Sequence, residues 1–186
     1  MRILGIALSG AIFAMGCASH PATNPVGQAF PRVEGKSLSG KEVVIPDDFS
    51  GQASLIVIGY KQKSQFDIDR WLLGLSTKKL GIPVYEVPSV VGFIPSLFSN
   101  GIDDGMRRGI PQEDWSNVVT IYNDADKVAQ FTGNDNGIVG RVVLLDAAGR
   151  VQFFHDRGFS VGALERLSQV VADLSQKSIA ARGQER

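Results

Sequence analysis

Residues 158–162 (GFSVG) match the G-x-S-x-G pattern that holds the nucleophilic serine of many hydrolases. Such a serine needs a histidine to act as its base. The chain has two histidines, His20 and His155, and both precede Ser160, whereas hydrolases with this pattern place the acid and the histidine after the serine. Ser160 also follows a glycine and precedes a helical pattern, so we expect it to cap that helix and not to act as a nucleophile.

Cys17 is the sole cysteine, and a targeting segment precedes it. Arg2 supplies a positive charge, residues 3–13 are apolar or small, and small residues lead up to the cysteine. The apolar run is shorter than the roughly 20 residues that a permanent membrane helix needs. The pattern therefore predicts a signal peptide over residues 1–16.

Gly16 directly before Cys17, with Ala14 two places earlier, resembles the signal of bacterial lipoproteins. The resemblance implies that the signal is cut before Cys17, that its thiol receives a diacylglyceryl group and that its new amine is acylated. Ala18 implies sorting to the periplasmic face of the outer membrane. Several acyl chains together hold a protein firmly at a bilayer. A plain secretory signal that happens to contain a cysteine is the alternative.

The composition is that of one ordinary globular domain in a chain of 186 residues. The 19 basic residues balance 19 acidic ones with no basic tract longer than a pair, which excludes a nucleic-acid partner. With two histidines and a lipid-bearing cysteine, we expect no metal, no cofactor and no intrachain disulfide. We predict a solvated, lipidated tether over residues 17–29, a domain over 30–178 and a disordered tail over 179–186.

Residues 54–60 (SLIVIGY) form a continuous apolar run, typical of a strand buried on both faces of a sheet that helices cover. Residues 66–75 then place apolar side chains at helical spacing, with Asp67, Asp69 and Arg70 on the opposite face. The other elements that the pattern predicts are strands at 43–45, 83–91 and 118–122, helices at 93–108, 125–131 and 161–175, and a hairpin at 141–154.

This order, with an antiparallel hairpin before a final helix, is that of the thioredoxin fold. Residues 84–88 (VYEVP) and 104–111 (DGMRRGIP) resemble, more narrowly, thioredoxin-like relatives of the mitochondrial ATP synthase assembly factor. The resemblance implies an α/β fold with a central mixed sheet flanked by helices. The stretches that resemble the thioredoxin and peroxiredoxin superfamily are 30–31, 38–46, 49–51, 55–60 and 143–149.

Redox members of that superfamily hold a nucleophilic cysteine at the start of the first main helix, where the helix dipole favours a thiolate. Here that place is residues 61–66 (KQKSQF), without a cysteine, and Gly140 stands where the superfamily has a cis-proline. The Ser64 hydroxyl is too weakly acidic to replace a thiol without a base. We therefore expect no thiol–disulfide or peroxidase activity, and no enzyme of that kind.

A binding role remains, as a scaffold or assembly helper that contacts an unidentified envelope protein. Binding grooves can survive the loss of a nucleophile, so we expect the contact surface at the former active site and at a nearby helix. An enzyme or a small-ligand carrier that uses the pocket around residues 61–64 is the alternative. The structural alternative for residues 103–108 is that their acidic and basic side chains form ion pairs on the surface of the helix. The predicted contact residues are Lys61, Gln62, Lys63, Ser64, Gln65, Asp103, Asp104, Arg107 and Arg108.

Lipidation of Cys17 gives a direct test. In a bacterial host supplied with a labelled fatty acid, the chain should incorporate label, whereas Cys17→Ser should incorporate none because the acceptor thiol is gone. Gel fluorography of the purified chain measures the incorporation. Equal labelling of both proteins contradicts the lipoprotein interpretation.

Overall fold

The computed structural model describes residues 19–90 and 99–184. Cys17, the predicted signal peptide and the first part of the predicted helix at 93–108 lie outside these residues. The centre of the fold is a four-stranded mixed sheet in the order β4-β3-β6-β7. β3 pairs parallel with β4 and antiparallel with β6, and β6 pairs antiparallel with β7. Their bounds are β3 Ser54–Gly59, β4 Val84–Pro88, β6 Arg141–Leu145 and β7 Val151–His155.

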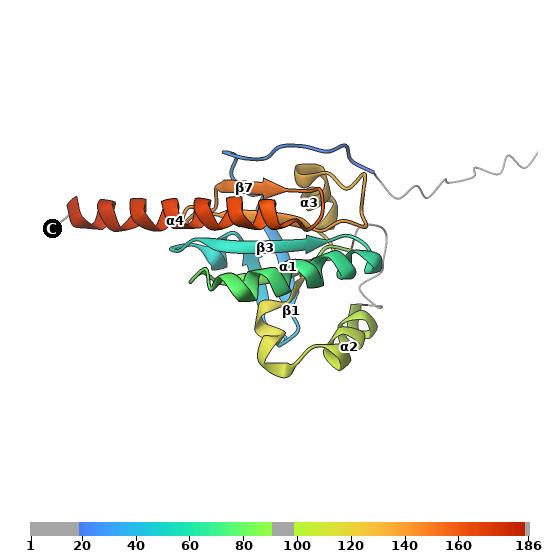
Figure 1. The fold of residues 1–186 in the computed structure, drawn as a ribbon. Helices are drawn as coiled ribbons and strands as arrows, with labels where there is room; N and C mark the ends of the chain where they lie inside the picture. The colour runs from blue at the N-terminus through green and yellow to red at the C-terminus, as the bar shows by residue number, and fades with distance from the viewer. Residues whose placement is uncertain (1–18, 91–98, 185–186) are drawn as a thin grey trace, which may run out of the picture.

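β3 is buried along its whole length, as its apolar sequence predicts. Its alternate residues face two separate cores, because successive strand side chains point to opposite faces. Leu55 and Val57 pack with the helices α1 (Gln65–Lys78) and α4 (Val161–Gln184), which cover one face of the sheet. Figure 1 shows both helices running along β3.

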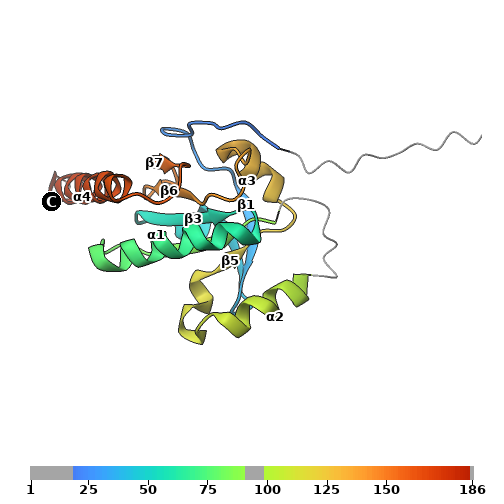
Figure 2. The ribbon, with the colours of Figure 1, turned by 45° about the vertical axis from the view of Figure 1, so that its right-hand side comes forward.

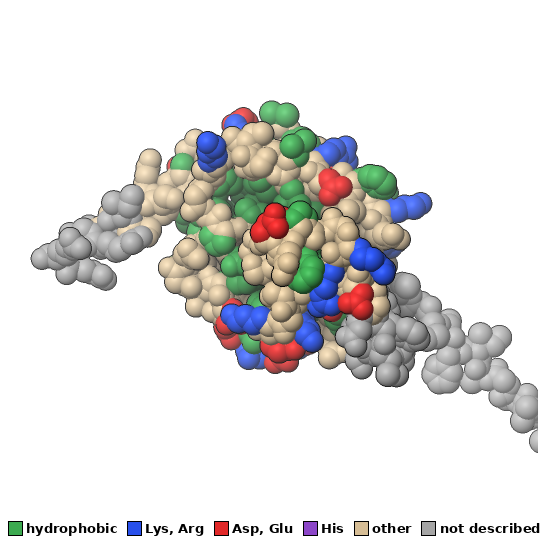
Figure 3. Space-filling model, turned by 90° about the horizontal axis from the view of Figure 1, so that it is seen from below, with side chains coloured by type: hydrophobic (Ala, Val, Ile, Leu, Met, Phe, Trp, Pro, Cys, Tyr) green, Lys and Arg blue, Asp and Glu red, His purple; other side chains and the backbone are tan. Residues whose placement is uncertain are grey.

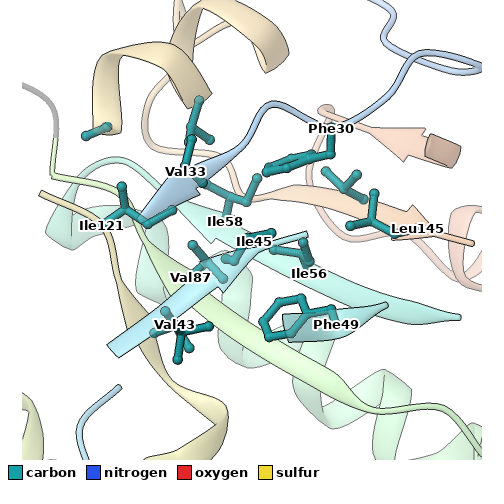
Figure 4. Close-up of a cluster of buried hydrophobic side chains, with 14 of the residues drawn as sticks. Phe30, Val33, Val43, Ile45, Phe49, Ile56, Ile58, Val87, Ile121 and Leu145 are labelled. Atoms are coloured by element: carbon teal, nitrogen blue, oxygen red, sulfur yellow. The ribbon is translucent and has the colours of Figure 1, made fainter. Parts of the chain in front are cut away.

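The opposite face of the sheet carries a second layer. Ile56 and Ile58 pack there against a three-stranded sheet in the order β2-β1-β5, and Phe30 joins the same core (Figure 4). The bridge pair Ser89 and Ile121 ties β4 to the residues after β5, so the two sheets are continuous at that corner. The elements of this layer are β1 Val33–Ser37, β2 Glu42–Ile45, β5 Val119–Thr120 and the helix α3 Ala125–Thr132.

Two helices lie apart from this stack. α2 (Ser99–Gly109) and the short 3-10 helix η4 (Gln112–Asn117) lie beside α1, on the side of the molecule away from residues 20–30 (Figures 1 and 2). All of α2 except its last residue, Gly109, lies within the helix that the pattern analysis predicted at 93–108. Among the described residues, no helix is long and apolar enough to cross a membrane.

The described part of the tether predicted for residues 17–29 is largely exposed, but it does not run free of the domain. Residues 20–30, here called the N-terminal strap, lie along the domain. The His20 amide donates to Asn134 Oδ1 at 2.7 Å, and Thr23 Oγ1 donates to the carbonyl of Phe131 at 2.6 Å. Gly133 has a φ of +70°, and a Cβ there would lie 2.5 Å from the carbonyl oxygen of Pro21. A polar, proline-containing sequence therefore does not imply a free tether when its backbone finds partners.

A further difference concerns the C-terminal end of α4. α4 continues to Gln184, where the pattern predicted a disordered tail over residues 179–186, because polar residues continue a helix whose packed part ends near Leu174. β1 was not predicted at all, since its sequence, VEGKS, has three residues with poor strand propensity. Its pairing with β2 and β5 decides its conformation.

Candidate functional site

The loop that would carry thiol chemistry in redox relatives holds its serine in a structural bond. Lys61, Gln62 and Lys63 are exposed, whereas Ser64 is buried. Ser64 Oγ donates to the carbonyl of Lys61 at 2.6 Å, within the 3-10 turn η2 (Gln62–Ser64) that precedes α1. The hydroxyl thereby stabilises the turn and does not point at an open site.

Asp67 organises this end of the molecule. Its side chain is buried, and its two oxygens accept the Gly140 amide at 3.0 Å and the Phe159 amide at 2.8 Å. Arg70 donates to the same carboxylate at 3.1 Å. The prediction that Asp67 lies on the solvent face of its helix is therefore wrong, because two loops from the far end of the sequence cover that side of the first turn.

Three exposed hydrophobic side chains lie within two residues of Asp67 or of a backbone amide that it binds. Phe66 is its neighbour on α1 and is 76% exposed, Ile138 lies two residues before Gly140, and Val161 lies two residues after Phe159. Lys61 packs across Gly137, where a Cβ would lie 3.0 Å from Lys61 Cε. We call the exposed residues Lys61, Lys63, Phe66, Ile138 and Val161 the loop surface.

Ser160 acts as the helix cap that the sequence predicted. Its Oγ accepts the Ala163 amide at 3.1 Å in the first turn of α4. His155 Nε2 lies 2.8 Å from the Gly158 carbonyl, so the ring donates to the glycine turn. Neither side chain is aligned as the serine and the base of a hydrolase.

A groove of about 930 Å³ runs between α1, β4, α2 and η4. Figure 3, which views the molecule from below, shows this groove as a hollow with hydrophobic side chains inside it and charged side chains around its rim. Gln65 lines it together with Gly105 and Met106 of α2. The groove therefore connects the end of the predicted contact segment 61–65 with the predicted contact segment 103–108. Its apolar lining includes Leu72, Leu75, Ile82, Val84, Met106 and Ile110.

Glu86 is the buried carboxyl of this groove. It lies in the middle of β4 and is 8% exposed. Burial raises its pKa above the ordinary value, the nearby Asp69 charge raises it further, and a hydrogen bond from Gln65 lowers it. The pattern analysis missed Glu86 as a site residue, although an acidic residue inside an apolar strand pattern, VYEVP, was the signal that could have found it.

The predicted contact residues on α2 have mixed positions. Asp103 is buried and accepts a hydrogen bond from the Tyr122 hydroxyl at 2.8 Å, so it is no surface ion pair; burial raises the pKa of that phenol. Arg107 donates to Asp104 Oδ1 at 2.8 Å, as the ion-pair alternative predicts, and also to the Leu38 carbonyl at 2.9 Å. Arg108 is exposed.

Arg107 is half-buried and its guanidinium lies 5.7 Å from the centre of the Trp115 ring. With its bond to Leu38, this contact fastens α2 to η4 and to the turn after β1. Its role is structural, whereas Asp104 and Arg108 remain available at the surface. Among the residues that the structure describes, no three acidic, histidine or cysteine side chains are placed to hold a metal ion.

Solved structures with a similar fold include a SCO1/SenC family lipoprotein from Bacillus anthracis, with a TM-score of 0.57, 14% identity and coverage of 83% of this chain and 99% of that one. A thiol peroxidase from Chromobacterium violaceum has a TM-score of 0.54 and 14% identity over 81% of this chain and 90% of its own. Copper-bound yeast Sco1 has a TM-score of 0.54 and 13% identity over 81% of this chain and 95% of its own. No family model and no curated protein matches the chain.

These likenesses confirm the fold that the sequence predicted. The chain has a thioredoxin-like α/β fold with a mixed sheet and flanking helices, and one of these structural neighbours is a lipoprotein. At such identities the likeness is one of fold alone. The narrower resemblance to relatives of the ATP synthase assembly factor stays a prediction.

Replacing Asp67 should loosen the loop surface. In Asp67→Asn, an amide NH₂ faces one of the two backbone amides, so the free energy of unfolding should fall by about 1–3 kcal/mol. Urea denaturation measures it. Asp69→Asn, on the exposed side of the same turn, is the matched control and should change stability by less than about 0.5 kcal/mol. Equal effects of the two substitutions would show that the Asp67 bonds contribute little.

Glu86 should make stability depend on pH. Because its pKa in the folded chain is raised above the ordinary 4.5, the folded state holds this proton more tightly than the unfolded state, and stability is lost as the pH rises through that pKa. Glu86→Gln should therefore be more stable than the wild type at neutral pH, and the difference should vanish below about pH 4. Thermal unfolding at several pH values measures this.

Glu113→Gln is the control for that series, since Glu113 is exposed on η4. It should leave the unfolding temperature unchanged throughout. A Glu86→Gln protein less stable than the wild type at neutral pH contradicts the account of Glu86 as a carboxyl that burial penalises.

Proposed function

We propose that this chain is a lipid-anchored, thioredoxin-like protein of the bacterial cell envelope that acts by binding another protein, without redox chemistry. The observation that carries the proposal is the loop surface. Phe66 of α1, Ile138 in the loop before β6 and Val161 at the start of α4 are all more than half exposed, and each lies within two residues of Asp67 or of a backbone amide that Asp67 binds. Exposed hydrophobic side chains gathered on one rigid surface are typical of interaction sites.

The former active-site loop supports binding over catalysis. Residues 61–66 contain no cysteine, and the Ser64 hydroxyl is used within its own turn. What remains at the surface are the cations Lys61 and Lys63 beside Phe66. A partner segment with apolar and acidic side chains complements this combination, because its charges would steer the approach while its apolar groups supply contact area.

The N-terminal strap supports a partner at the membrane. The His20 amide is bonded to Asn134, and Cys17 precedes His20 by three residues. Three residues span at most about 11 Å, so an acylated Cys17 holds Asn134 close to the bilayer. Ile138 follows Asn134 by only four residues. The loop surface would therefore face partners that are themselves held at the same membrane, as an assembly helper or scaffold requires.

In-cell crosslinking with mass spectrometry tests the proposal. Phe66→Ser with Ile138→Ser should reduce crosslinks to a specific envelope protein at least about tenfold, since central apolar contacts often contribute 2 kcal/mol or more to an interface. Because both side chains are exposed, the unfolding temperature should not fall. The matched control is Leu73→Ser with Val26→Ser, two exposed hydrophobic residues that are not part of the loop surface, Leu73 being two helical turns along α1 from Phe66.

The control pair should keep every crosslink. The proposal is wrong if the Phe66 and Ile138 variant also keeps them, or if the wild-type chain crosslinks to no protein while the purified chain turns over a substrate. Carriage of a small ligand is the second candidate function, and the groove beside β4 is the observation that favours it.

A further inference from the structure

We infer that the groove between α1 and α2 binds a small molecule in which a protonated amine is joined to an apolar body. This site is separate from the loop surface and does not depend on the function proposed for it. Among the predicted contact residues 61–65, Gln65 is the one that lines the groove.

The size and walls of the groove fit a small molecule. Its volume of about 930 Å³ lies within the roughly 300–1,000 Å³ of typical ligand sites, which are largely apolar with a few converging polar groups. Leu72 and Leu75 of α1 face it from one side, and Met106 and Ile110 from the other. An apolar body placed between these walls removes both surfaces from water.

The polar groups gather at one end. Gln65 and Asp69 lie one helical turn apart on α1, and Gln65 Nε2 donates to Asp69 Oδ1 at 2.9 Å. Glu86 of β4 lines the same groove, and Gln65 and Asp69 are the two side chains that influence the pKa of its carboxyl. The far end combines apolar Leu80 and Ile82 with the cation Lys79, which disfavours an amine there. A ligand therefore binds in one orientation, with its polar head at Glu86.

The charge of this end selects a cation. Of the charged side chains that line the groove, Asp69, Glu86 and Asp114 are acidic and Lys79 is basic. Lys79 follows the last turn of α1, ten residues beyond Asp69 and about 15 Å away along the helix axis. Within the described part of the chain, no lysine, arginine or histidine forms an ion pair with Glu86.

A buried carboxylate without a cationic partner is unfavourable, and a cation brought by a ligand relieves that penalty. An ammonium group has three donors, which suits a groove that the carboxyls of both Glu86 and Asp69 line. A neutral alcohol makes a weaker bond there, and a carboxylate is repelled. The same apolar body should therefore bind in the order amine, alcohol, acid.

Isothermal titration calorimetry of the full chain, in phospholipid nanodiscs if it carries lipid, tests this order with phenylbutylamine, phenylbutanol and phenylbutyrate. Empty nanodiscs correct for partition into lipid. Phenylbutylamine should bind roughly tenfold to a hundredfold more tightly than phenylbutanol, since a hydrogen bond to a charged group is the stronger one. Phenylbutyrate should bind most weakly.

Glu86→Gln should remove this preference for the amine and leave the affinity for phenylbutanol unchanged, which also shows that the groove is intact. Glu113→Gln is the matched control outside the groove and should bind like the wild type. The inference is overturned if phenylbutylamine does not bind, if it binds no better than phenylbutanol, or if Glu86→Gln retains the preference. None of these results affects the crosslinking test of the loop surface.

Discussion

The hydrogen bonds of the Asp67 carboxylate are the interaction on which the arrangement of the loop surface depends. A buried charge is expensive unless it is hydrogen-bonded, and here two backbone amides and Arg70 meet that requirement. The bonds fix the first turn of α1 against the loops before β6 and α4. Because Ile138 precedes one of these bonded amides and Val161 follows the other, one side chain holds the first turn of α1 against both of these parts of the loop surface.

α1 serves two sites because it has more than one apolar side. Ile68 and Trp71 pack against the sheet and α4, whereas Leu72 turns toward the groove. The end of the helix at Phe66 belongs to the loop surface. The supports of this end are hydrogen bonds that Asp67 accepts and apolar packing, and none of them depends on sulfur.

Much of the fold could be predicted from local patterns. The apolar run of β3, the hairpin β6–β7 and the cap at Ser160 are short-range features, and the structure contains all three. β1 could not be found in this way, because its sequence lacks strand propensity and its conformation comes from pairing with β2 and β5. The N-terminal strap was misjudged for the same reason, since its partners lie more than a hundred residues away.

The sequence by itself determined that residues 61–66 hold no thiol, that the central sheet has an apolar core and that α1 has an apolar face. These features follow from residue type and from periodicity over a few neighbouring residues. Only the tertiary structure decided that Asp67 is buried and that Glu86 lies in a groove. Helical periodicity placed Asp67 on a polar face, and it carries no information about loops that return 73 and 92 residues later to cover that face. Burial of a polar side chain is a property of everything packed around it.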